Sequence, residues 1–166
     1  MIKPIITIVA LSAGLSFSAW AAEEKEGVEE KVSLEKIPPP AAKTLKEHAG
    51  DAKITNLSKE TDEGKIVFEA SFKKNGRAHD VTVDEHGKLI SDEEVVPLSE
   101  APEAVRTSLE KEHPGGKVEK FERIKEGGKV SYEALISSKG KREEIKFDSK
   151  GKVLEREDKS HDKDKD

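Results

Sequence analysis

Two short acidic segments contain the residue types that could bind a cation. They are Asp84-Glu85-His86-Gly87 and Asp148-Ser149-Lys150-Gly151, and each begins with aspartate and ends with glycine. A calcium site needs six or more oxygen ligands, whereas each segment supplies one or two carboxylates. An aspartate that opens a turn accepts hydrogen bonds from nearby backbone N–H groups, and glycine tolerates the positive φ that follows. We therefore interpret both segments as structural turns.

The histidines are the other candidate metal ligands, and there are five: His48, His79, His86, His113 and His161. None stands at a tight ligand spacing such as H-E-x-x-H. His48 and His113 fall near the ends of expected helices, where a partial positive charge is favourable. We predict no metal site and no cofactor. The acidic charge and the five histidines leave one alternative open, a cation- or small-ligand-binding envelope protein.

Paired carboxylates are the remaining candidates for chemistry. The expected strands turn Glu69 and Glu133 to the same face, where they would contact a ligand or form an ordinary cross-strand ion pair such as Glu133–Lys146. The ion pair is the simpler interpretation. The sequence contains no Ser/His/Asp ordering, phosphate-binding loop or dinucleotide fingerprint. We predict that the protein is not an enzyme.

Composition excludes further classes of function. The chain has 166 residues, enough for one domain or two very small ones. It contains no cysteine, which rules out disulfides, thiolate nucleophiles and zinc–thiolate sites. A net charge of −5 argues against a nucleic-acid partner, which requires a basic face. An aromatic content of 4% leaves little for stacking a base, a sugar or a flat cofactor.

The two ends differ in composition from the rest of the chain. Residues 1–21 have a positive Lys3, an apolar run and Ala19-Trp20-Ala21, the pattern of a cleavable signal peptide. We expect a periplasmic or secreted protein without a stable membrane anchor after cleavage. Residues 22–31 are predicted to be a flexible acidic segment, and residues 159–166 a disordered charged tail.

The chain between these ends consists of two tandem sequence repeats. An offset of 64 residues aligns repeat 1 (32–94) with repeat 2 (96–158) without a gap, and fourteen of the 63 columns are identical. The glycines and the apolar columns align as well. A single repeat of this length buries too little apolar surface to be comfortably stable, so we expect the two repeats to share a core.

Each repeat is predicted to be a helix followed by four strands. The helix of repeat 1 is expected to begin at Pro38–Pro40, and in repeat 2 Ser99 is expected to cap a helix that has Pro102 in its first turn. Asn75-Gly76 predicts a two-residue type I′ hairpin, which sets Phe68 opposite Val83 on one face. The predicted fold is α+β, with about eight antiparallel strands, both helices on one face and the other face open to solvent.

The opening Pro38–Ala42 and the segment Asp84–Lys88, with Pro102–Val105 and Asp148–Lys152 in repeat 2, resemble the PepSY-like family. The tandem arrangement is similar to the fold of beta-lactamase inhibitor proteins and covers about 32–158. The resemblance implies a secreted or periplasmic, non-catalytic module that inhibits or regulates an enzyme such as a peptidase. Two departures limit it, because those inhibitors have disulfides and an aromatic-rich sheet face, which this chain lacks.

The open face is the predicted binding surface, and its partner is expected to be an unidentified envelope protein. Leu135 is its most unusual position, because repeat 1 has Ser71 there. The candidate partner-binding residues are Val67, Glu69, Ser71, Lys73, Asp80, Thr82, Glu133, Leu135, Glu144 and Lys146.

Overall fold

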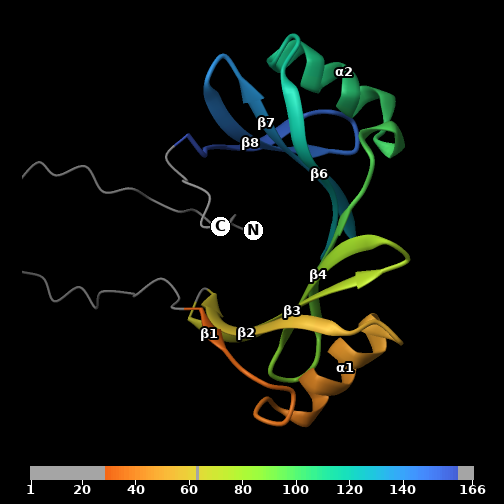
Figure 1. Cartoon of the computed structure of the whole chain (residues 1–166), viewed down its shortest axis with the longest axis vertical. Helices are drawn as coiled ribbons and strands as arrows, with labels where there is room; N and C mark the ends of the chain where they lie inside the picture. The colour runs from red at the N-terminus through yellow and green to blue at the C-terminus, as the bar shows by residue number, and fades with distance from the viewer. Residues whose placement is uncertain (1–28, 63, 161–166) are drawn as a thin grey trace, which may run out of the picture.

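The computed structural model describes residues 29–62 and 64–160, which form one nine-stranded antiparallel sheet and two α-helices (Figure 1). Neighbouring strands in the sheet are consecutive in the chain, so the sheet is a meander. The predicted α+β class is confirmed, with nine strands in place of about eight. The strands are β1 (Glu30–Lys31), β2 (Ile54–Asp62), β3 (Lys65–Lys74), β4 (Arg77–Asp84), β5 (Leu89–Val95), β6 (Lys117–Glu126), β7 (Lys129–Ser138), β8 (Lys141–Asp148) and β9 (Val153–Asp158).

A proline directly precedes each helix. Helix α1 spans Pro39–Ala49 after Pro38, and α2 spans Glu103–Glu112 after Pro102. The expected cap at Ser99 is wrong, because Ser99 lies in a separate 3-10 turn, Leu98–Glu100, and no side chain caps α2. A proline needs no N–H partner, so it starts a helix where that hydrogen bond would be missing anyway.

The predicted hairpin register is confirmed in both repeats. Phe68 lies opposite Val83 and Glu69 opposite Thr82, while Glu133 lies opposite Lys146 in repeat 2. The turn has the expected geometry, since φ is 52° at Asn75 and 83° at Gly76. Because side chains alternate along a strand, this register sends the apolar residues to one face and the polar residues to the other.

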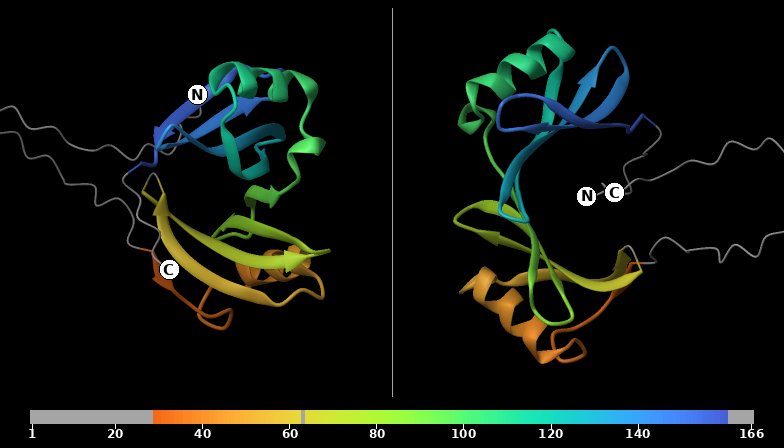
Figure 2. Two further views of the ribbon diagram at one scale, coloured as in Figure 1. Left: turned by 45° about the horizontal axis from the view of Figure 1, so that its top comes forward. Right: turned by 180° about the vertical axis from the view of Figure 1, so that it is seen from behind.

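The sheet is strongly curved, and both helices lie against its convex side (Figure 2). Register shifts interrupt the β2–β3, β4–β5, β6–β7 and β8–β9 pairings. Extra residues of this kind bend a strand and increase its twist. The concave face therefore remains uncovered by either helix, and it opens in the direction away from α1 and α2.

Each helix packs on its own repeat and builds its own core. Leu45 of α1 is buried against β2, β3 and β4 in a cluster that includes Phe68 and Val83. Val105 and Leu109 of α2 are buried with Phe147 in a second cluster. The expectation of a shared core is wrong. The cluster of α1 involves β2, β3 and β4, and that of α2 involves β6 to β9, so each helix buries its apolar face within its own repeat.

The two D-x-x-G-K segments are turns, as expected. The Oδ1 atom of Asp84 accepts hydrogen bonds from the backbone N–H groups of His86 and Lys88, at 2.9 and 2.8 Å. Asp148 repeats this arrangement with Lys150 and Lys152 at 2.8 and 2.9 Å. Each carboxylate thus organises its own loop.

The ends of the described region are more ordered than the sequence indicates. Glu30 and Lys31, in the segment expected to be flexible, pair with Lys59 and Ser58 of β2. Beyond β9, the Lys159 N–H donates to the Arg142 carbonyl at 2.9 Å. The predicted signal peptide, residues 1–21, lies outside the described residues. No helix in residues 29–62 or 64–160 is long and apolar enough to cross a membrane.

Candidate functional site

The ten residues predicted to bind a partner all project from the concave face. Strand β3 carries four of them, at alternate positions from Val67 to Lys73, and β4, β7 and β8 carry two each. The cross-strand pairs Glu69–Thr82 and Leu135–Glu144 fix which face they share. They form two groups, one in each repeat, because the prediction did not include the strands that lie between them.

Strands β5 and β6 join the two groups. Glu93 pairs with Asp80 on one side and with Ile124 on the other, and Glu122 pairs with Glu133. All of these residues are therefore on the concave face. The alternation within Leu89–Val95 is a signal that could have identified Glu93, whereas the pairing of β5 with β6 is set by the tertiary structure.

Part of the concave face is shielded from water although no helix covers it. Val67 is 4% exposed and Ile124 is 3% exposed, and neither belongs to the two helix-packed cores. Glu122 is also buried, and its carboxylate forms an ion pair with Lys120 at 2.8 Å. Leu135 remains half-buried. The concave face thus consists of a partly shielded floor with polar side chains around it.

Two carboxyl groups on the concave face hold protons unusually tightly. Burial raises the pKa of Glu69 to about 7, and the neighbouring charge of Asp80 adds to the effect. Burial likewise raises the pKa of Glu93 to about 7, with Glu122 and Asp80 adding repulsion. These two groups belong to one run of carboxylates on β3, β4 and β5, so ionising either group increases the repulsion within that run.

A second carboxyl pair lies in repeat 2. Burial raises the pKa of Glu133 to about 9. The hydrogen bond from Glu133 holds the pKa of Glu144 below its usual value. The protonated Glu133 therefore donates to the Glu144 carboxylate. The ion pair expected between Glu133 and Lys146 is replaced by this contact, and Lys146 lies 3.9 Å from Glu126.

Lysines lie mainly on the repeat 2 side of the face. Lys120 contacts Glu122, and Lys159 lies 3.5 Å from Glu144 and 2.9 Å from Glu157. On the repeat 1 side, Lys73 is exposed at the margin. The concave face therefore changes from carboxylate-rich in repeat 1 to mixed charge in repeat 2.

Two histidines in the described residues, His79 and His113, act as structural partners. His79 stacks on Phe72 with 5.4 Å between ring centroids, and its Nδ1 lies 3.3 Å from Asp92. His113, after α2, lies 2.5 Å from Glu143. Within the part of the chain that the structure describes, no three His, Asp or Glu side chains are grouped to hold a metal ion. His161 lies outside that part.

Comparison with known proteins gives consistent matches over nearly the whole described region. A family model described as beta-lactamase-inhibitor-like, PepSY-like matches the chain twice, at residues 17–91 and 90–155. The uncharacterized protein YkoJ of Bacillus subtilis is 25% identical over 154 residues, which is 88% of this chain and 89% of YkoJ.

Solved structures show the same fold. A BLIP-like protein from Bacteroides fragilis superposes with a TM-score of 0.60 at 16% identity, covering 78% of this chain and 92% of that one. A protein from Bacteroides eggerthii, described as a proposed periplasmic protein, gives a TM-score of 0.64 at 19% identity, covering 75% of this chain and 90% of its own. That description agrees with the export expected from the sequence.

Proposed function

The chain belongs to the beta-lactamase-inhibitor-like, PepSY-like family, and we propose that it is an exported, non-catalytic module that binds an envelope protein. The binding surface in this proposal is the concave face. The observation that carries it is the position of both helices on the convex side, so that, among the described residues, no helix covers the inner face of the nine-stranded sheet (Figure 2).

The concave face has the properties of a preformed protein-binding surface. Its side chains project from paired strands, so no backbone segment of the surface has to become ordered when a partner binds. The half-buried Leu135 supplies an apolar contact in polar surroundings, and the shielded Ile124 supports the floor. A protein interface typically combines such a desolvated centre with a polar rim.

The carboxyl pair Glu133 and Glu144 gives the concave face of repeat 2 a protonated donor beside a carboxylate acceptor, because burial raises the pKa of Glu133 and the pKa of Glu144 is lowered. Both groups are suited to hydrogen bonds with polar groups of a partner protein. Inhibition or regulation of an envelope enzyme, such as a peptidase, is the functional outcome we propose for occupation of this surface.

Site-specific photo-crosslinking in the native envelope tests the proposal. A photoreactive residue at Leu135 samples the concave face, and the same residue at exposed Arg106 on α2 samples the convex side. We expect a discrete adduct with one envelope protein from position 135 and none from position 106. Mass spectrometry identifies the adduct. Equal labelling from both positions, or an adduct from position 106 alone, would remove the concave face from the proposal.

The identified partner then allows a quantitative test. Leu135→Asp places a charge where the proposal needs an apolar contact, and we expect it to weaken binding at least about tenfold, or 1.4 kcal/mol. Thr107→Asp, at an exposed position on α2, makes the same change from an uncharged to an acidic side chain on the convex side and should leave the affinity unchanged. If the partner is an enzyme, the same two variants show whether inhibition follows binding.

A further inference from the structure

The two repeats meet at a junction without a hydrophobic core. The apolar cluster of repeat 1 ends at Val83, and that of repeat 2 begins at Val96. Among the described strands, β5 and β6 alone pair across the junction, with Ser91–Val95 opposite Glu122–Glu126. On the convex side, α1 and α2 lie toward opposite ends of the curved sheet (Figure 2), and the α2 cluster reaches β6 only at Val118 and Phe121, before the segment that pairs with β5.

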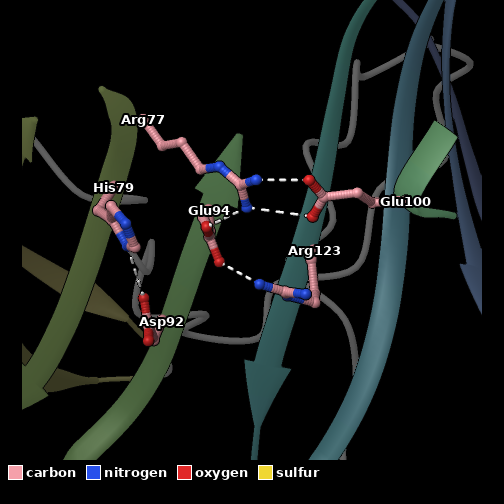
Figure 3. A network of polar contacts seen from close by, with 6 residues as sticks. All are labelled: Arg77, His79, Asp92, Glu94, Glu100 and Arg123. Atoms are coloured by element: carbon pink, nitrogen blue, oxygen red, sulfur yellow. Dashed lines mark hydrogen bonds and ion pairs between the residues drawn. The ribbon is translucent and has the colours of Figure 1, made fainter. Parts of the chain in front are cut away.

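Charged side chains occupy this uncovered junction (Figure 3). Glu94 of β5 accepts from Arg77 of β4 at 2.8 Å and also from Arg123 of β6. Arg77 reaches further and donates to both carboxylate oxygens of Glu100, one of them at 3.1 Å. The Glu94–Arg123 and Arg77–Glu100 contacts each join repeat 1 to repeat 2. We call Arg77, Glu94, Glu100 and Arg123 the junction network.

We propose that the junction network sets the angle between the two repeats and thereby the curvature of the concave face. A single strand pairing can twist and bend, because adjacent strands tolerate a wide range of relative rotation. Two arginine–carboxylate contacts across the pairing restrict that motion on the convex side. Widening or narrowing the angle changes the spacing between the repeat 1 and repeat 2 groups on the opposite face.

The chemistry of the contacts suits this role. The guanidinium is planar and engages the Glu100 carboxylate through two nitrogens, which fixes direction as well as distance. The Glu94 side chain is only 13% exposed, so its charge is screened less than that of a surface pair. Hydrogen bonds from Arg77 and Arg123 hold the pKa of Glu94 below its usual value, although burial acts in the opposite direction. Glu94 therefore stays ionised between two cations.

Distance measurements between the helices test the inference. The chain has no cysteine, so Lys43→Cys on α1 and Thr107→Cys on α2 introduce two unique spin-label sites at exposed positions. Pulsed electron paramagnetic resonance then gives the distribution of distances between the repeats. In this labelled background, Glu94→Gln removes the central charge and keeps the side-chain shape. We expect the mean distance to shift or the distribution to become about twofold wider.

Two further variants make the test decisive. Glu100→Gln removes only the half-exposed end of the network and should widen the distribution less than Glu94→Gln, without risk to folding. Glu112→Gln is the matched control, because Glu112 pairs with Arg156 entirely within repeat 2. It should leave the distribution unchanged. High salt should widen the distribution of the wild type more than that of Glu94→Gln.

The inference is overturned if Glu94→Gln and Glu100→Gln, both with wild-type circular dichroism, give the wild-type distribution. It is equally overturned if Glu112→Gln broadens the distribution as much as Glu94→Gln does. Neither result depends on a bound partner, so this test is independent of the proposed function.

Discussion

The glycine of the first D-x-x-G-K turn is expected to be far less replaceable than an ordinary turn glycine. A Cβ atom at Gly87 would lie 2.5 Å from the Pro40 carbonyl oxygen in the first turn of α1, whereas ordinary contacts begin at 3.4 Å. The Thr44 hydroxyl also donates to the Gly87 carbonyl at 2.8 Å. Gly87→Ala therefore has to push α1 away from the sheet or displace the turn.

The magnitude follows from comparison with Gly76, which has φ of 83° and no atom within 4 Å of an added Cβ. A non-glycine residue at positive φ costs about 1 kcal/mol, and this is the whole expected cost of Gly76→Ala. Gly87, at φ of 78°, adds an overpacking term of about 1–3 kcal/mol and a weakened hydrogen bond worth about 1 kcal/mol. We expect Gly87→Ala to lower the free energy of unfolding by about 3–5 kcal/mol.

Urea denaturation followed by far-ultraviolet circular dichroism measures both variants under the same conditions. Repeat 2 offers an internal replicate, because a Cβ at Gly151 would lie 2.3 Å from the Ala104 carbonyl oxygen, while Gly140 has open space. We expect Gly151→Ala to exceed Gly140→Ala by a similar margin. Equal losses for Gly87→Ala and Gly76→Ala would refute the argument that helix contact, and not φ alone, requires glycine in this turn.

Other expected outcomes concern protonation, the cores and the second turn. Because burial raises the pKa of Glu69 and Glu93 to about 7, the fold loses stability as pH rises from about 4.5 to 7. Glu93→Gln should therefore stabilise the fold by about 1 kcal/mol more at pH 8 than at pH 4. An equal effect at both pH values in chemical denaturation would contradict this. Leu45→Ala should lower the free energy of unfolding by about 3 kcal/mol and accelerate hydrogen exchange mainly in repeat 1. Phe147→Ala should accelerate hydrogen exchange mainly in repeat 2. Uniform acceleration across both repeats would favour one cooperative core. Asp148→Ala removes two hydrogen bonds to backbone N–H groups and should lower the thermal midpoint, whereas a midpoint equal to the wild type would show that the loop is held by other contacts.

Sequence reasoning was most accurate where the structure depends on neighbouring residues. The Asn75-Gly76 hairpin is an example, because positive φ at two adjacent positions selects a type I′ turn and the turn then fixes the register from Phe68 to Val83. The Asp84 turn is equally local, since its hydrogen bonds reach only two and four residues ahead. Such features need no knowledge of distant segments.

Sequence reasoning failed where the outcome depends on which segments meet in space. The predicted shared core was inferred from the small size of one repeat, yet Leu45 and Leu109 pack in separate clusters. The predicted Glu133–Lys146 ion pair had the correct register, but Glu133 interacts with Glu144, its diagonal neighbour on β8, and Lys146 lies near Glu126. Register alone does not determine where a long side chain directs its charge.

The sequence by itself therefore determined the α+β fold class, the repeated order of the helices and strands, and the face of the sheet on which each strand residue lies. Those properties follow from periodicity and turn chemistry, which act over a few residues. Only the tertiary structure decided the curvature of the sheet, the shielding of Val67 and Ile124, and the meeting of Arg77 with Glu100 across the junction. These depend on how strands bend and on which repeats become neighbours, and no local pattern specifies either.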